Sequence, residues 1–231
     1  NLFTECRGTL TLRHGNGCTV EGNAFFGGGA ESTGGIRLIG EDHRVFNNYL
    51  QDLTGRGFYS AISLVQGEPD TAINGYFAAK NCSVVNNTVY NCFSGLNINH
   101  TGKRNQVRIE NNTIANNLVV NVTDDKKAES VKVSITPQAP LATVYAGNIV
   151  WGGKIKGVEP SEAAITEADP ALRRIGGYYV PVRKTYLDRN RVDGFDFVTE
   201  DIAGTPRGKK VTCGAFEPVG KLPSSVPTAD G

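Results

Sequence analysis

An asparagine motif that recurs five times constrains the fold of this chain more than any other feature of its sequence. Each copy has an apolar residue, two spacers, Asn, one spacer and a second apolar residue. The five asparagines are Asn23, Asn48, Asn87, Asn112 and Asn148. They are separated by 25, 39, 25 and 36 residues. A basic repeat of about 25 residues, lengthened by insertions in two of its turns, fits all four spacings.

A second set of short segments lies between these motifs and alternates apolar with polar residues. The segments are 10–12, 36–38, 62–64, 96–98 and 131–133. Alternation with a period of two is typical of strands with one buried face. Two or three such strands per turn predict an all-β fold, a right-handed parallel β-helix, which is a solenoid whose turns pack only against their neighbours. Asn suits its turns because Asn tolerates the left-handed backbone conformation.

Two other repeat architectures fit the pattern less well. Leucine-rich repeats have similar asparagine spacing, but the leucine-rich helical half of such a repeat is missing here. A propeller needs four strands and about 40 residues per repeat. The β-helix is therefore the predicted fold.

The chain is long enough, at 231 residues, for one all-β domain. We predict a single β-helix domain over 1–231, with regular turns over 1–150 and a segment over 151–220 that packs along the last turns and covers their open end. Residues 221–231 are expected to form a tail or linker. Two stretches interrupt the repeat, 51–74 and the charged segment 122–130.

Composition excludes several classes of protein. The 24 Lys and Arg residues nearly balance the 23 Asp and Glu residues, so no global field favours nucleic acid. No apolar run is long enough to span a bilayer. The five cysteines form no Cys-x-x-Cys pair and have no nearby histidine at ligand spacing, which argues against a zinc site. Because the chain has no Met and opens on strand-like residues, we expect it to be part of a longer protein whose first turns are missing here.

Two arginines stand out among the outward positions of the alternating strands. Arg13 and Arg37 are 24 residues apart, which predicts that they lie side by side on one outer sheet, since adjacent strands are about 4.8 Å apart. Like charges on neighbouring strands repel unless an anion lies between them, and a guanidinium suits a carboxylate such as that of a uronic acid. His14, His43 and Tyr59 are expected near the same site. For His43 a packed structural role is the alternative, because it lies five residues before a motif asparagine, as Cys18 and Cys82 do. The other outward positions contain no carboxylate, which disfavours a glycosidase.

At these residues the chain resembles a known family. Segments 6–16, 20–23 and 34–40, together with His43, resemble polysaccharide lyase family six, the right-handed β-helices that include alginate lyases and chondroitinase B. The stretches Thr-Leu-Arg-His-Gly-Asn at 11–16 and Gly-Gly-Ile-Arg at 34–37 are closer to the alginate-cleaving members. The similarity is specific through about residue 48 and extends weakly through the segment 201–207.

The resemblance implies β-elimination on a uronic-acid polymer. In that reaction the uronate carboxylate is neutralised, a base removes the C5 proton and the O4 leaving group is protonated. The resemblance assigns Arg13 as the catalytic acid and His14, Arg37 and His43 to substrate binding. Because a guanidinium stays protonated to above about pH 12, we expect Arg13 to stabilise developing charge and His14 to supply or relay the proton. Tyr59 is a further candidate for substrate binding.

Other family features would lie upstream of Asn1. These are the lysine that acts as base and the ligands of a calcium ion, and none of Lys80, Lys103 and Lys132 matches the lysine's position. We therefore expect a secreted or periplasmic alginate lyase that acts on an anionic polysaccharide. The present chain should be inactive unless upstream turns, for example from a companion chain, complete it. The alternatives are a chondroitin or dermatan sulfate lyase and a noncatalytic β-helix with a glycan-binding or structural role.

Overall fold

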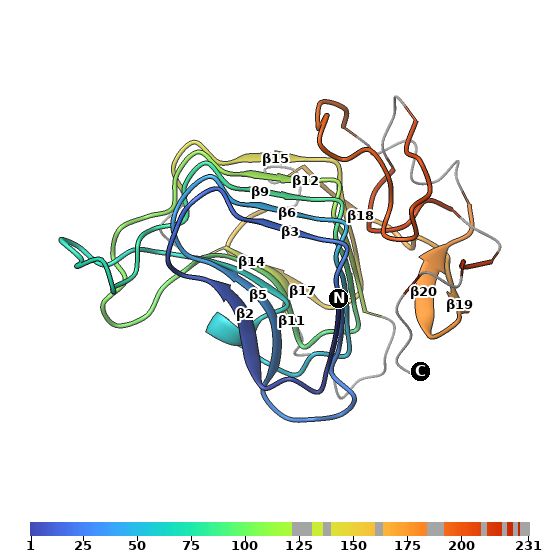
Figure 1. Cartoon of the computed structure of the whole chain (residues 1–231), viewed down its shortest axis with the longest axis horizontal. Coiled ribbons are helices and arrows are strands. Elements are labelled where there is room, and N and C mark those ends of the chain that lie inside the picture. Colours follow the sequence, from blue (N-terminus) through green and yellow to red (C-terminus); the bar gives the residue numbers. More distant parts are fainter. Residues whose placement is uncertain are drawn as a thin grey trace.

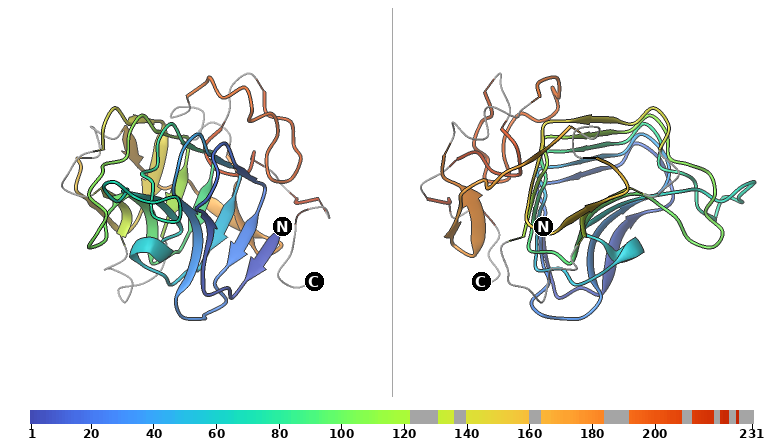
Figure 2. Two further views of the ribbon diagram at one scale, coloured as in Figure 1. Left: turned by 60° about the vertical axis from the view of Figure 1, so that its left-hand side comes forward. Right: turned by 180° about the vertical axis from the view of Figure 1, so that it is seen from behind.

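The chain folds into a right-handed parallel β-helix (Figures 1 and 2). The computed structural model describes residues 1–121, 131–135, 140–159, 164–183, 192–208, 212–218, 221–223 and 226. Within these residues three parallel sheets run along the solenoid, and β19 and β20 form an antiparallel hairpin beside it. The predicted insertion at 122–130 lies outside the described residues, as does most of the predicted tail at 221–231.

Each sheet takes one strand from each successive turn. Sheet A contains β1 (Leu2–Thr4), β4 (Ala24–Phe26), β7 (Tyr49–Gln51), β10 (Thr88–Tyr90), β13 (Leu118–Val120), β16 (Asn148–Trp151) and β18 (Ile165–Glu167). Sheet B contains β2 (Gly8–Leu12), β5 (Thr33–Leu38), β8 (Ile62–Val65), β11 (Ser94–His100), β14 (Val131–Ile135) and β17 (Lys154–Lys156). Sheet C contains β3 (Thr19–Glu21), β6 (Arg44–Phe46), β9 (Ser83–Val85), β12 (Thr113–Ala115) and β15 (Val144–Ala146). The hairpin consists of β19 (Leu172–Ile175) and β20 (Tyr178–Pro181).

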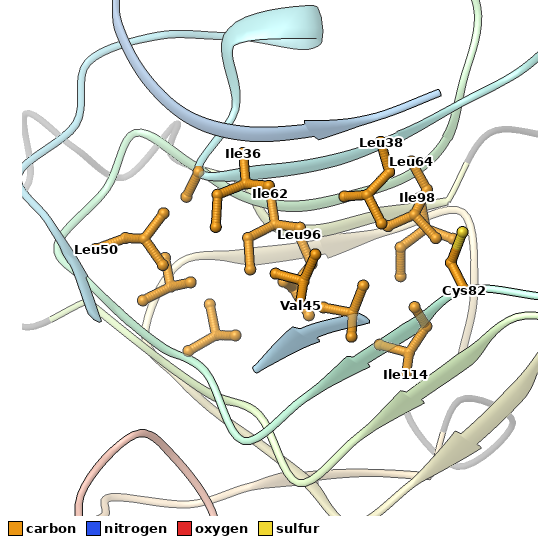
Figure 3. Close-up of a cluster of buried hydrophobic side chains, with 14 of the residues drawn as sticks. Ile36, Leu38, Val45, Leu50, Ile62, Leu64, Cys82, Leu96, Ile98 and Ile114 are labelled. Carbon is orange, nitrogen blue, oxygen red and sulfur yellow. The ribbon is translucent and has the colours of Figure 1, made fainter. Parts of the chain in front are cut away.

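The alternating segments of the sequence form sheet B, as predicted. Leu10, Ile36, Ile62, Leu96 and Val133 follow one another in register from strand to strand. The apolar residues of β5, β8 and β11 in this column are buried in the interior of the solenoid (Figure 3). Because these side chains point inward, the residues between them face outward from sheet B.

A ladder of asparagine side chains joins the turns at the corner between sheets C and A. The Oδ1 atom of each member after the first accepts hydrogen bonds of 3.0–3.1 Å from the backbone N–H and the Nδ2 group of the preceding member. The members are Asn23, Asn48, Asn87, Asn117 and Asn148. Their side-chain amides are buried, so each bond also meets the requirement that buried polar groups be paired.

The prediction of the fourth ladder asparagine was wrong: the residue is Asn117, five positions after the predicted Asn112. Ile114 pairs with Val84 of the preceding turn, which places Asn117, and not Asn112, beneath Asn87. Asn112 instead accepts a hydrogen bond from the backbone N–H of Cys82 (2.9 Å). Both asparagines satisfy the sequence motif, and only the length of the inserted loop decides between them.

The carboxyl-terminal segment packs along the outside of sheets A and C (Figures 1 and 2). Asn47 and Asn116, two turn residues with φ of 54° and 52°, bind it through their side chains. Asn47 donates to the carbonyl of Glu200 (2.5 Å), and Asn116 donates to the carbonyl of Val192 (2.6 Å). Buried Arg207 donates to Glu217 (2.8 Å) within the segment. The segment thus lies along the side of the solenoid from an early turn onward, and does not pack only along the last turns as we expected.

Three further observations bear on the sequence predictions. Parallel pairing continues past residue 150, because β17 pairs with β14 and β18 pairs with β16. None of the five cysteines is in a disulfide bond. No helix of the described residues is long and apolar enough to cross a membrane.

The ladder predicts a large effect of Asn87→Ala on stability. This change leaves the carbonyl of Val45 without its side-chain donor and the buried backbone N–H of Asn48 without its acceptor, and each unsatisfied group costs about 1–3 kcal/mol. We expect the free energy of unfolding, measured by urea denaturation, to fall by at least about 2 kcal/mol. Asn74→Ala, at an exposed loop position, is the control and should change it by less than about 0.5 kcal/mol. Equal effects of the two changes would contradict the structural role of the ladder.

Candidate active site

A short 3₁₀ turn lies on the outer face of sheet B and defines one side of the candidate site. This turn, η1 (Gly57–Tyr59), is the coil outside β2, β5 and β11 in Figure 1. The carbonyl oxygen of Gly57 accepts hydrogen bonds from Ser63 Oγ (2.7 Å) and Asn97 Nδ2 (3.0 Å). Ser63 and Asn97 are neighbours in register on β8 and β11. The outward polar residues of two strands therefore fix η1 on the sheet.

The aromatic residues of η1 lie against Arg37. The Cζ atom of Arg37 is 5.6 Å from the centroid of the Phe58 ring and 6.0 Å from that of Tyr59, distances at which a cation is attracted to an aromatic face. Its Nη2 atom donates to Thr11 Oγ1 (3.1 Å). Tyr59 is 44% exposed, so its ring forms part of the accessible surface beside Arg37.

Arg13 is held by the loop between β8 and β9. Its Nη2 atom donates to the carbonyl of Asn74 (2.9 Å), and its Cζ atom lies 4.7 Å from the centroid of the Tyr76 ring. The loop is closed at its base by a hydrogen bond from the N–H of Glu68 to the carbonyl of Tyr76 (2.8 Å). Tyr76 in turn contacts Phe58, with ring centroids 6.0 Å apart. Two aromatic rings thus connect the two arginines.

Arg13 and Arg37 share a face of sheet B but do not stand directly side by side. Leu10 pairs with Ile36 and Thr11 pairs with Arg37, so the turn contains 26 residues at this sheet, not 24. Arg13 follows the last residue of β2 and is displaced along the strand by two positions from the partner of Arg37. The prediction of one outward face was right and the prediction of direct adjacency was wrong.

A cavity of about 330 Å³ opens beside Arg13 and His14. Its lining residues are Arg13, His14, Gly15, Asn16, Gly40, Glu41, Ile73 and Phe77. The side chain of His14 is exposed. Asn16 Oδ1 accepts the backbone N–H of Glu41 (3.1 Å), which ties together the turns that carry His14 and Glu41. Glu41 places one carboxylate at the edge of a site that we expected to contain none, but it is not the pair that a glycosidase uses.

His43 lies inside the protein and not in the cavity. Its side chain is fully buried. Its Nδ1 atom accepts the backbone N–H of Cys18 (3.2 Å), so the proton is on Nε2, which donates to the carbonyl of Ile39 (3.1 Å). Both ring nitrogens are therefore engaged, and this geometry gives His43 no free atom for the substrate contact that we predicted.

Three site residues were missed by the sequence analysis: Phe58, Tyr76 and His100. Phe58 and Tyr76 belong to long connections of the solenoid, where the sequence predicts only Tyr59 as a site residue. His100 ends β11, and its ring packs against Phe58 with centroids 4.4 Å apart. Aromatic residues in otherwise polar insertions next to the arginine strands were the only available signal.

The charge of the two arginines is not neutralised by protein carboxylates. Within the described residues neither Arg13 nor Arg37 forms a salt bridge, and each Nε atom is buried without a hydrogen-bond partner. Their remaining contacts are to neutral oxygens and aromatic rings. The same part of the chain contains no cluster of three or more His, Cys, Asp or Glu residues that could hold a metal ion.

These features define a parallel β-helix with two unpaired arginines on one outer face. Residues 1–198 match the model of the family described as chondroitinase B. The chain belongs to this family, polysaccharide lyase family six. No curated protein sequence matches the chain.

Solved structures agree with this assignment. The PL6 family alginate lyase AlyGC is similar to the chain at 30% identity, with a TM-score of 0.67 over 95% of this chain and 28% of AlyGC. An arginine-to-alanine mutant of AlyGC matches at 34% identity over 80% of this chain and 24% of the mutant, with a TM-score of 0.66. A mannuronic acid specific family 6 lyase from human gut microbiota matches at 25% identity, with a TM-score of 0.50 over 65% of this chain and 33% of that enzyme. The chain thus spans about a quarter to a third of these proteins.

The contrast between the two histidines can be tested by their effects on stability. His43→Ala leaves the N–H of Cys18 and the carbonyl of Ile39 without partners in the interior, so the free energy of unfolding should fall by about 2 kcal/mol or more. His14→Ala removes an exposed side chain and should change it by less than about 0.5 kcal/mol. Urea denaturation of both variants measures the difference. A His43 variant as stable as the His14 variant would contradict the structural role of His43.

Proposed function

We propose that this chain is the arginine-bearing part of a polysaccharide lyase that cleaves a uronic-acid polymer, alginate in the first instance, by β-elimination. One observation carries the proposal: Arg13 and Arg37 share an outer face and have no carboxylate partner among the described residues. Two such cations on one face, of which Arg13 lines a cavity, favour an anionic ligand. The planar guanidinium fits the two oxygens of a carboxylate.

Each residue has a proposed part in the reaction. Arg37 binds and neutralises the carboxylate of the uronate unit, which acidifies the proton on C5. Loss of that proton to a base and cleavage of the C4–O4 bond leave a C4–C5 double bond, and O4 receives a proton. Arg13 stabilises the charge that develops on the enolate and on O4, and exposed His14 supplies or relays the proton. Tyr59 contacts the sugar beside Arg37.

The base and the calcium ion are proposed to be supplied by turns upstream of this sequence. The present chain spans 28% of the length of AlyGC, which is compatible with a larger parent protein. The described residues offer no acidic cluster that fits calcium, so no step here is assigned to it. We propose that the parent protein acts as a secreted or periplasmic enzyme and that the present chain alone is inactive.

The description of the matching family favours a sulfated glycosaminoglycan as the second candidate substrate. The matching family model is described as chondroitinase B, so a dermatan or chondroitin sulfate is the alternative polymer. Alginate is preferred because AlyGC, the alginate lyase matched over 95% of this chain, is 30% identical to it. If the chain binds a glycan without cleaving it, the same arginines would serve a binding module.

The test uses the full-length protein that contains this sequence. Cleavage of alginate, dermatan sulfate and a neutral glucan is followed by the ultraviolet absorbance of the unsaturated product. We expect cleavage of alginate, and a loss of at least about 100-fold in kcat/KM for Arg13→Ala. Arg44→Ala is the matched control, because Arg44 lies on sheet C against the Phe197 ring (4.8 Å) and outside the site. It should retain kcat/KM within about two-fold.

The outcomes separate the hypotheses. Cleavage of dermatan sulfate alone would favour the alternative polymer. Binding of alginate without product would favour a binding module. Full activity of the Arg13 variant would refute the assigned role of Arg13.

A further inference from the structure

His100 has no part in the function proposed above, although it lies on the same face as Arg37. It is one of three histidines in the chain and ends β11, which is two strands from β5 in sheet B. Its side chain is half-buried. Part of the side chain can therefore be reached by a ligand, while the rest packs against neighbouring residues.

The η1 turn holds the imidazole in one place. The Phe58 ring meets it edge-on, with an interplanar angle of 89° and centroids 4.4 Å apart. On the other side, a Cβ atom at Gly57 would come within 3.2 Å of Cε1 and 3.3 Å of Nε2 of the imidazole. Gly57 also has a φ of 59°, so glycine satisfies both the backbone conformation and the space that His100 needs.

The surroundings keep the imidazole neutral. Burial, and then the positive charge of Arg37, lower the pKa of His100. On β5, β8 and η1, Arg37 is the only charged residue, and β11 itself carries no charge other than that of His100. β14, the other neighbour of β11, carries Lys132, and the turn directly after β11 carries Lys103 and Arg104, so the charged residues on these elements are all positive. A neutral imidazole has one N–H donor and one acceptor nitrogen. Within the described residues neither ring nitrogen forms a hydrogen bond, and the side chain is only partly buried.

We propose that His100 is a further substrate-binding residue, whose imidazole hydrogen-bonds a hydroxyl of the uronate unit next to the one that Arg37 holds by its carboxylate. This inference rests on the function proposed above. The arginines select for charge and would accept any polyanion of suitable spacing. A neutral group with one donor and one acceptor adds discrimination by hydroxyl position, because a polar site rejects a ligand that leaves its buried groups unpaired.

The 231-residue chain allows a direct test by NMR, because it has only three histidine Cε1–H signals to assign. The probe is an alginate trisaccharide, with a glucose trisaccharide as the uncharged control. We expect the uronate, and not the glucan, to shift the His100 signal and to raise the pKa of His100, because a carboxylate on Arg37 removes part of the repulsion that lowers it. A nuclear Overhauser effect between His100 Cε1–H and a sugar proton should accompany the shift.

Affinity measurements separate contact from indirect effects. His100→Ala should raise the Kd for the uronate trisaccharide by about five-fold, in keeping with the loss of one hydrogen bond. His100→Gln keeps a donor and should stay within about two-fold of the parent chain. Perturbation of His14 without any change at His100 would overturn this inference and leave the proposed function standing. A uronate that disturbs neither histidine would contradict both.

Discussion

The hydrogen bond between stacked asparagine amides is the interaction on which the rest of the structure depends. From Asn48 onward, each amide oxygen accepts two bonds from the asparagine of the preceding turn, and each amide nitrogen also donates to a backbone carbonyl of that turn, as in the 2.9 Å bond from Asn87 to Val45. Because these groups are buried, a slip of one residue would leave several of them unpaired. The ladder therefore sets the register of successive turns, and with it the positions of the outward residues on sheet B.

The long connections of the solenoid convert that regular face into a site. A plain β-helix would leave Arg13 and Arg37 as solvated side chains on adjacent strands. The η1 turn and the loop ending at Tyr76 place aromatic rings and a carbonyl around both guanidinium groups. These neutral partners orient the arginines without neutralising them, which leaves their charge for an anionic ligand. Orientation without neutralisation is what a site for a uronate carboxylate requires.

Much of the fold could be predicted from periodicity, because each turn repeats the same burial pattern. The strands of sheet B followed from alternation alone. Asn117 was missed because two asparagines five residues apart both fit the motif, and loop length is not encoded in the motif. The prediction that the two arginines are adjacent was wrong for a related reason. The number of residues per turn differs between positions on the solenoid: it is 26 at sheet B and 25 at the ladder between Asn23 and Asn48. The offset that His43 shares with Cys18 and Cys82 allowed a packed role, but its hydrogen bonds to Cys18 and Ile39 are tertiary contacts that the repeat alone does not specify.

The central claim is that Arg37 binds a uronate carboxylate on the outer face of sheet B and that Arg13 lies at the reacting O4. A crystal structure of the chain with an alginate trisaccharide tests this most directly. The account predicts carboxylate oxygens within hydrogen-bonding distance of the Arg37 guanidinium group, the glycosidic O4 beside the Arg13 guanidinium group, and a sugar ring beside Tyr59. A trisaccharide bound elsewhere on the chain, with both guanidinium groups in solvent, would contradict it.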